Sequence, residues 1–309
     1  MFSYKPIVDD SSSNIPNGII EEDETVNLVG TLENLGSASA TSVTGVLTSS
    51  DPVTINNANA VYPDIMPGSK QNSTISYSIT PYAINRTATH WDFTVTESPS
   101  CMECSTISYN FTYHVGNSFV DVPTSDIFYS SIETLLHSEI TGGCDAENYC
   151  PSYDSLREQM AKFICKSMEQ LNPGSCSATS CQEIFTDVPF SNIFCSYIET
   201  LYDAGITGGC QTYPLLYCPN IPVQREGMAK FICLAMESVN PGSCPTAPSC
   251  AGIFNDVPAS NPFCIFIEAL YEAGVISGCQ SMPLLYCPDY DITRAQMAKF
   301  LVNGFGFNL

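Results

Sequence analysis

Cysteine is the most informative residue type in this chain, because its number and spacing limit the chemistry that it can support. The sequence contains 16 cysteines, and all but Cys101 and Cys104 lie from Cys144 onward. A zinc site would require close cysteine pairs with further cysteine or histidine ligands. Only Cys101 and Cys104 have the CxxC spacing, and the histidines are far apart, at His90, His114 and His137. The even number and recurring spacings favour disulfides over zinc, and with them an oxidising, extracellular compartment.

The second half of the chain contains a sequence unit that occurs three times. The units open with FVDVP (119–123), FTDVP (185–189) and FNDVP (254–258), and each continues with an amphipathic helix pattern and a GITGGC-like turn. A second helix pattern begins near an arginine, and these arginines recur with almost constant spacing, at Arg157, Arg225 and Arg294. Such a period indicates an array of one supersecondary unit whose copies cover each other's apolar faces.

The cysteines of the second half fall into two groups. The first group flanks the loop between the two helices of each unit, and we expect it to close that loop with the pairs Cys144–Cys150, Cys210–Cys218 and Cys279–Cys287. The second group lies at the junctions between units, where four cysteines allow three connectivities. There we favour Cys165–Cys176 with Cys181–Cys195, and Cys233–Cys244 with Cys250–Cys264. The last expected pair is Cys101–Cys104. A redox role for the loop pairs does not fit, because reactive pairs usually lie two residues apart.

The first half of the chain has the two-residue period of half-buried strands. Trp91, Phe93 and Val95 alternate with polar residues, and the segments 75–79 and 107–113 show the same pattern. Turn signals such as PNG and PG separate these segments. About eight short strands in this length predict a β-sandwich of immunoglobulin type.

Together, the motifs of the second half resemble a known family. FxDVP, a helix, a GITxGC turn, YCP and a helix that contains MAKF resemble the S-layer homology repeat, and more narrowly its cysteine-bearing bacterial variety. The resemblance implies a compact three-unit bundle, which in many members anchors exported proteins to cell-wall polysaccharide. Residues 9–43 look like the Ig-like domains of secreted bacterial proteins. The expected fold is therefore multidomain β + α and stapled by disulfides, with an Ig-like β-sandwich over 1–116 and S-layer homology repeats over 117–175, 176–243 and 244–309.

The resemblance also implies a glycan-binding role for Arg157, Arg225 and Arg294, which stand where the family's anchoring groove has an ITRAE-like helix start. The rest of that motif departs from the family pattern, because its final Glu is replaced by Gln159, Gly227 and Gln296. The alternative is structural, since an arginine at a helix start can bond loop carbonyls or the aspartates of the FxDVP motifs. We favour the structural interpretation, because arginine and aspartate occur together in every unit.

An acidic turn in the first half is a candidate calcium site, because its hard oxygen atoms suit this ion. The expected ligands are Asp9, Asp10, Asn17 and Glu24. The alternative is a solvated turn without an ion, and no other cofactor is expected. Sequons at Asn72, Asn85 and Asn110 fit N-glycosylation, although chance occurrence in a Thr-rich β-domain is the simpler explanation.

Charge and hydropathy exclude several functions. The net charge is −22, which repels nucleic acid and anionic membrane surfaces. No apolar run approaches the roughly 18 residues that would span a membrane. The start MFSYKPIVDD lacks the features of a signal peptide, so we expect either a processed terminus or an export signal outside this sequence.

No catalytic motif is present, and we therefore expect a non-enzymatic extracellular structural protein. Its partners would be copies of itself, in a surface layer, tube or filament. Phe2 and Tyr4 alternate at one end of the chain, and Phe305, Phe307 and Leu309 at the other, so both tails could add as strands to a neighbouring copy. For the N-terminus the alternative is a first strand of its own sheet. Two other functions stay open: an anchor that binds cell-wall polysaccharide, and the non-catalytic C-terminal region of a secreted enzyme.

Overall fold

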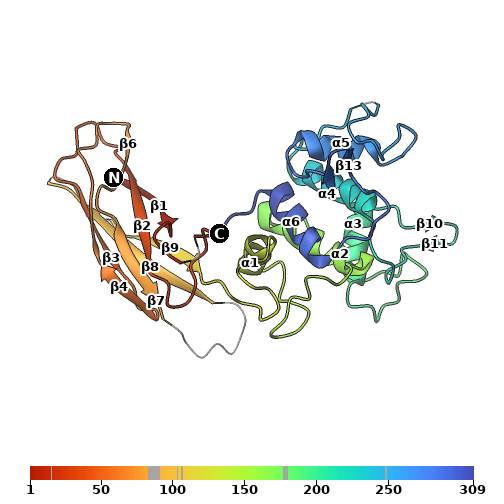
Figure 1. The fold of residues 1–309 in the computed structure, drawn as a ribbon, viewed down its shortest axis with the longest axis horizontal. Helices are drawn as coiled ribbons and strands as arrows, with labels where there is room; N and C mark the ends of the chain where they lie inside the picture. The colour runs from red at the N-terminus through yellow and green to blue at the C-terminus, as the bar shows by residue number, and fades with distance from the viewer. Residues whose placement is uncertain (15, 83–90, 103, 106, 177–179, 248) are drawn as a thin grey trace. The chain divides into compact units, whose positions relative to one another are not determined.

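The computed structural model describes residues 1–14, 16–82, 91–102, 104–105, 107–176, 180–247 and 249–309. The chain divides into two compact units: residues 1–133 with 145–148 and 309, and residues 134–144 with 149–308. The first unit consists mainly of strands and the second mainly of helices (Figure 1), so the fold is mixed β and α, as expected. In this division the start of the first repeat belongs with the strands, because it packs against them: the Tyr129 hydroxyl donates to Glu21, and His114 pairs with Glu133.

Two antiparallel sheets make up the first unit. In one sheet the strands follow the order β1 (Phe2–Asp9), β2 (Val26–Glu33), β7 (Tyr77–Pro81) and β4 (Val53–Asn57), and β6 (Lys70–Asn72) also pairs with β2. In the other the order is β5 (Asn59–Val61), β3 (Thr44–Thr48), β8 (Asp92–Ser100) and β9 (Tyr109–His114). Every second residue of β8 is buried, as the period of two predicted, and β2 shows the same alternation.

A hydrophobic core joins these sheets, and the side chain of Glu97 is buried between them. Glu97 is fully buried, and its oxygens accept hydrogen bonds from the hydroxyls of Tyr62 at 2.8 Å, Tyr77 at 2.6 Å and Ser3. A Cβ atom at Gly30 or Gly45 would overlap one of the two tyrosine hydroxyls. Glycine at these positions therefore leaves the space through which both tyrosines reach Glu97.

The repeats contribute six helices among the described residues. The first helices of the repeats are α1 (Tyr129–His137), α3 (Cys195–Asp203) and α5 (Cys264–Glu272), and the second helices are α2 (Arg157–Leu171), α4 (Arg225–Val239) and α6 (Arg294–Phe305). In repeats two and three a small hairpin lies between the first and the second helix. The hairpin of repeat two is β10–β11 (Gln211–Thr212, Leu215–Leu216), and that of repeat three is β12–β13 (Gln280–Ser281, Leu284–Leu285). None of the helices in this part of the chain is long and apolar enough to cross a membrane.

The second helices form the centre of the bundle. Helices α2, α4 and α6 pack against one another in pairs, while α3 packs on α2 and α5 packs on α4 (Figure 1). The first helix of one repeat therefore lies against the second helix of the preceding repeat. Helices α2 to α6 therefore each pack on at least one helix of a neighbouring unit, which is how repeat units cover one another's apolar faces.

The N-terminal tail forms a strand of the chain's own sheet, the alternative that the sequence left open, and the C-terminal tail is not a strand. Phe2 and Tyr4 lie in β1, which pairs with β2. Phe305 is the last residue of α6 and is buried, and the Phe307 ring stacks on it with centroids 5.9 Å apart. The alternation of aromatic residues at 305–309 was misleading, because Gly306 ends the helix in the left-handed conformation and turns the chain back onto it.

Candidate functional site

The three repeats meet in a closed triangle of backbone hydrogen bonds. The amide of Ser155 donates to the carbonyl of Ile292, that of Ile292 to Val223, and that of Val223 to Ser155, each at 2.9 Å. Each of these residues stands two positions before the arginine of its repeat. The triangle therefore places the three helix starts around one pseudo-three-fold axis.

A ring of arginine–tyrosine pairs surrounds this triangle. The Nε atom of Arg157 donates to the carbonyl of Tyr217 at 2.8 Å, and the Tyr217 hydroxyl donates back to the carbonyl of Arg157 at 2.8 Å. The same reciprocal pair joins Arg225 to Tyr286 and Arg294 to Tyr149. Each arginine thus bonds the tyrosine of the next repeat, and the last returns to the first, so the ring closes.

Aromatic rings enclose each guanidinium group. The Arg294 guanidinium lies 4.8 Å from the centre of the Tyr149 ring and 5.5 Å from that of Phe163, and the other two arginines have equivalent neighbours. Burial lowers the pKa of both Arg157 and Arg225. The side chains that the resemblance assigned to glycan are therefore largely used in contacts between repeats.

The FxDVP aspartates bind the same loops from the other side. The Asp187 carboxylate accepts hydrogen bonds from the amides of Tyr217 at 2.8 Å and Cys218 at 2.7 Å, and Asp256 binds Tyr286 and Cys287 in the same way. Arginine and aspartate thus hold the two sides of one tyrosine residue, the arginine its carbonyl and the aspartate its amide. Of the two structural contacts that we expected for the arginines, the structure shows the one with the loop carbonyls.

A third set of structural residues, the buried glutamates of the first helices, was not predicted from the sequence. Glu268 is only 5% exposed and accepts hydrogen bonds from the amides of Ala251, Gly252 and Ile253 at 2.6–2.8 Å. Glu199 binds the amides of Gln182 and Ile184 equivalently. Glu133 is fully buried in the same position of the first repeat. The signal was present, because each first helix contains the dipeptide Ile-Glu at the same place in its unit.

The structure joins all sixteen cysteines in eight disulfides. The pairs are those given above: Cys101–Cys104, Cys144–Cys150, Cys165–Cys176, Cys181–Cys195, Cys210–Cys218, Cys233–Cys244, Cys250–Cys264 and Cys279–Cys287. This content is typical of a secreted protein. Carboxylates lie near several pairs, as in the group Asp187, Cys210 and Cys218. Asp187 already accepts two backbone amides, which favours the disulfide over a metal ion there. Oxidation of the cysteines in solution stays a prediction.

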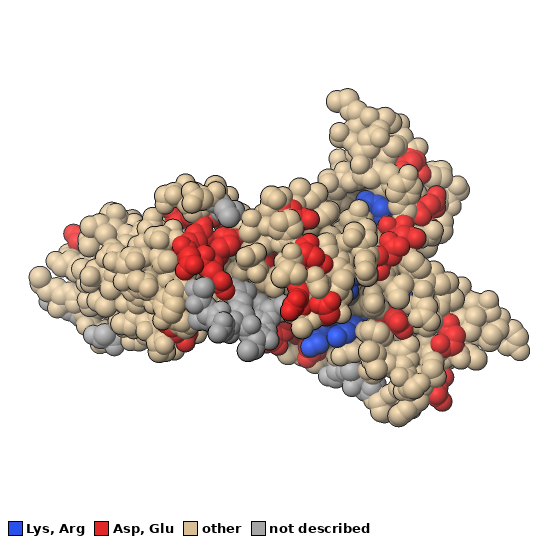
Figure 2. All heavy atoms as spheres, turned by 60° about the horizontal axis from the view of Figure 1, so that its bottom comes forward, with Lys and Arg blue, Asp and Glu red and all other residues tan. Residues whose placement is uncertain are grey.

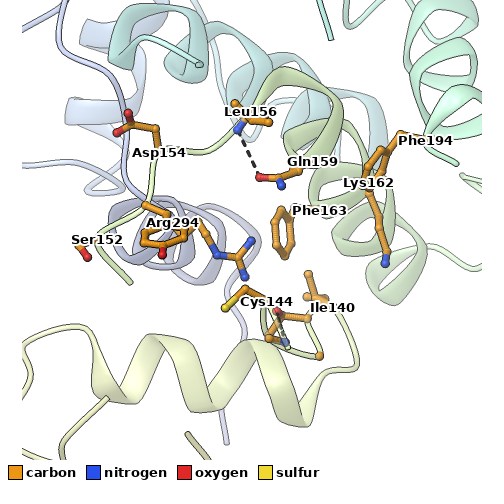
Figure 3. Close-up of a pocket in the computed structure, with 14 residues that line it drawn as sticks. Ile140, Cys144, Ser152, Asp154, Leu156, Gln159, Lys162, Phe163, Phe194 and Arg294 are labelled. Atoms are coloured by element: carbon orange, nitrogen blue, oxygen red, sulfur yellow. Dashed lines mark hydrogen bonds between the residues drawn. The ribbon is translucent and has the colours of Figure 1, made fainter. Parts of the chain in front are cut away.

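A groove of about 710 Å³ lies beside the arginine ring at the first repeat. Its lining includes Lys162, Phe163, Gln159 and Arg294, and Figure 3 shows the Arg294 guanidinium directed toward the Phe163 ring. Lys162 is exposed, and the Gln159 side chain accepts a hydrogen bond from the Leu156 amide at 3.3 Å. The groove therefore offers one exposed ammonium group and one buried guanidinium.

The equivalent groove at the second repeat is smaller, about 380 Å³. Gly227 stands there in place of Gln159, and Arg157 takes the place of Arg294. Among the described residues, no acceptor bonds the buried Nη2 atom of Arg157. Arg225, the third candidate glycan-binding residue, lines neither of these two grooves.

Several of the predicted calcium ligands of the acidic turn take part in hydrogen bonds within the turn. Asp9 is bonded to the Ser11 amide, and one oxygen of Asp10 accepts the amides of Asn17 and Gly18 at 2.8 and 2.7 Å. The Asn17 side chain donates to Glu21 at 2.8 Å. Glu24 lines a cavity of about 380 Å³ together with Glu21, which was not among the predicted ligands. Burial and the neighbouring Glu24 carboxyl raise the pKa of Glu21 to about 8.

The sequons differ in what the structure says of them. Asn72 in β6 and Asn110 in β9 are exposed, and their side chains accept hydrogen bonds from Thr31 and Thr96, both at 2.9 Å. Asn85 lies outside the described residues. Exposure makes glycosylation of Asn72 and Asn110 sterically feasible and does not test it.

Comparisons with known proteins add little. No family model matches the sequence, and no curated protein matches it. Among solved structures, the chain is similar to a conjugative transposon lipoprotein from Bacteroides eggerthii, with 10% identity over 36% of this chain and 93% of that one and a TM-score of 0.22. It is also similar to native α2-macroglobulin from Escherichia coli, with 11% identity over 88% of this chain, 16% of that one and a TM-score of 0.28. At these TM-scores neither likeness assigns a fold or a function.

Proposed function

We propose that this chain is a non-enzymatic structural protein of the cell surface, in which an Ig-like sandwich precedes three S-layer homology repeats and whose copies assemble with one another. The observation that carries the proposal is the closed arginine–tyrosine ring. In this ring the arginine of each repeat joins its own unit to the next one. Disulfides lie at the same junctions between units. A bundle held in this way suits a mechanical or architectural role.

Exposed apolar side chains at equivalent positions of the three repeats support assembly. Tyr153, Ile221 and Tyr290 are 66%, 54% and 69% exposed. The backbone carbonyl of each accepts a hydrogen bond from the amide of a ring arginine: Tyr153 from Arg294 at 2.8 Å, Ile221 from Arg157 at 3.0 Å and Tyr290 from Arg225 at 2.9 Å. All three residues therefore lie next to the arginine–tyrosine ring. Apolar groups repeated by the symmetry of a bundle form a surface that a second copy can cover.

Light scattering and electron microscopy of the oxidised full-length chain test this proposal. We expect assemblies larger than a monomer, and we expect the triple variant Tyr153→Ser, Ile221→Ser, Tyr290→Ser to shift the distribution toward monomer. Tyr82→Ser, at an exposed position of the first unit, is the matched control. A full-length protein that stays monomeric at high concentration would contradict assembly.

The grooves favour a second function, binding of an anionic cell-wall polysaccharide. Lys162 is exposed in the larger groove, and the unbonded Nη2 atom of Arg157 lies at the smaller one. The charge of the chain opposes this function: its net charge is −22, and acidic side chains gather in several groups on the face shown in Figure 2, with few basic ones between them. We therefore place anchoring second.

A pull-down with purified wall polysaccharide separates the two functions. Anchoring requires binding that Lys162→Ala weakens, while Lys299→Ala, the equivalent exposed lysine of the third repeat, leaves it unchanged. Arg294→Ala is a poor probe, because it would also break the ring. No binding by the wild-type chain would rule out the anchor and leave the structural proposal standing.

A further inference from the structure

A small cavity in the first unit is lined by two neighbouring carboxyl groups. Glu21 and Glu24 face a space of about 380 Å³, whose wall also includes Ser12, Asn14 and Thr25. The Glu24 carboxyl reaches back to Glu21, because it accepts a hydrogen bond from the Glu21 amide. Glu21 is only 7% exposed, which is unusual for an acidic side chain at a turn.

The hydrogen bonds of these groups leave one oxygen of each without a donor. Glu21 Oε1 accepts from the Asn17 side chain at 2.8 Å and from the Tyr129 hydroxyl at 3.1 Å, and Glu24 Oε2 accepts from the Glu21 amide at 2.9 Å. The other two oxygens, Glu21 Oε2 and Glu24 Oε1, are buried, and no described residue donates a hydrogen bond to either. Buried polar atoms without a partner are rare in folded proteins and commonly mark a bound ion or water.

The backbone holds the pair in place. The Glu24 amide donates to the Glu21 carbonyl at 3.2 Å, and the Asp23 amide donates to the Pro81 carbonyl at 2.7 Å at the end of β7. Asp23 itself has a φ of 59°, a conformation that non-glycine residues adopt mainly in tight turns. Because the turn is pinned on both sides, the two carboxyl groups cannot easily separate to relieve their repulsion.

We propose that Glu21 and Glu24 bind a divalent cation, Ca²⁺, through the oxygens Glu21 Oε2 and Glu24 Oε1. Glu21 is buried and Glu24 is half-buried, and two carboxylates with buried oxygens in one cavity are stable only when a proton or a cation offsets their charge. Ca²⁺ takes six to eight oxygen ligands in flexible geometry, so carboxylate oxygens and water in a cavity of this size suit it. This site is independent of assembly and of glycan binding. It replaces the ligand set predicted from the sequence, from which only Glu24 is retained.

Calcium titration of the chelator-treated full-length chain tests the site by calorimetry and by thermal unfolding. We expect binding in the range of about 10⁻⁴–10⁻³ M that is common for extracellular modules, with a rise in Tm. Glu21→Gln and Glu24→Gln should each weaken binding by at least about tenfold, the loss that outer-shell partners alone can cause. Asp9→Asn, on the same turn segment but outside the cavity, should bind as the wild type does.

Terbium luminescence gives a second readout. Because the Tyr129 hydroxyl bonds Glu21, excitation of tyrosine should sensitise Tb³⁺ at this site, and Tyr129→Phe should reduce that emission while calcium still binds. Far-UV circular dichroism verifies that each variant is folded. The proposal is overturned if millimolar Ca²⁺ leaves Tm unchanged and binds nowhere, or if folded Glu21→Gln and Glu24→Gln bind Ca²⁺ as tightly as the wild type. Either result would show that this pair of carboxyl groups does not hold the ion.

Discussion

Arg157 and Tyr217 bind each other's backbone. The arginine Nε donates to the tyrosine carbonyl, and the tyrosine hydroxyl donates to the arginine carbonyl, both at 2.8 Å. The two residues are 60 positions apart and belong to successive repeats. Because Arg294 and Tyr149 repeat this geometry between the last repeat and the first, loss of any one pair opens the ring.

Replacement of Arg157 tests the contribution of the ring to stability. We expect Arg157→Lys to lower the free energy of unfolding by about 1.5–3 kcal/mol, because it removes a charged hydrogen bond to a buried carbonyl. Lysine also lacks the planar group that stacks on Tyr217 and Phe231. Denaturant unfolding measures the change. Lys162→Met, an exposed substitution on the same helix, should stay within about 0.5 kcal/mol of the wild type.

The buried glutamates allow a matched pair of variants on one helix. Glu268→Gln places an amide group among three backbone amides, so at least one donor loses its acceptor, and we expect a loss of about 1–3 kcal/mol. Glu272→Gln, exposed on the same helix α5, should have almost no effect. Equal stability of the two variants would contradict the role assigned to Glu268.

Disulfide formation can be tested by alkylation and by mutation. Alkylation without reductant, followed by mass spectrometry, should label none of the 16 cysteines. The double variant Cys181→Ser, Cys195→Ser should lose about 3 kcal/mol of stability, the chain-entropy value for a loop of about 15 residues. Cys101→Ser with Cys104→Ser opens a much shorter loop and should cost less. Labelling of several cysteines in the repeats of the unreduced protein would refute the disulfide framework.

The stability of the first unit should depend on the protonation of His114. Burial disfavours its charged form, but hydrogen bonds to Asp92 at 2.9 Å and Glu133 at 2.8 Å outweigh this and raise the pKa of His114. Because His114 binds its proton more tightly in the folded chain than in the unfolded one, protonation stabilises the fold. This contribution is fully present below the unfolded-state pKa of about 6.5 and is lost as pH rises through the folded-state pKa.

Comparison with His114→Gln isolates this contribution. The wild type should exceed the variant in unfolding free energy by the largest margin below about pH 6.5, and the margin should shrink as pH rises. The raised pKa of Glu21 also lowers the unfolding free energy at high pH. Because Glu21 is present in both the wild type and the variant, its contribution cancels in the difference between their unfolding free energies. A margin that does not change between pH 5 and 9 would contradict the assignment.

The local sequence was sufficient to predict the periodic features of this chain. The alternation of β8, the three repeats and the grouping of cysteines into loop and junction pairs are visible because each depends on spacing along the chain. The structure joins the same cysteine pairs, since every partner lies at most 14 residues away. The buried glutamates also had a signal in the Ile-Glu dipeptides, although their partners did not.

Only the tertiary structure decided which polar groups meet across long separations. The sequence placed an arginine and an aspartate in every repeat, but the tyrosine that each arginine binds belongs to the next repeat, and the order closes only when α2, α4 and α6 pack together. The acidic turn shows the same limit. Composition selected Asp9, Asp10, Asn17 and Glu24 as ligands. In the structure backbone amides donate to the carboxylates of Asp9 and Asp10. Glu21 shares a cavity with Glu24 and accepts a hydrogen bond from the Tyr129 hydroxyl. Hydrogen bonding and burial depend on the neighbours that folding supplies, and the spacing of residues along the chain does not contain them.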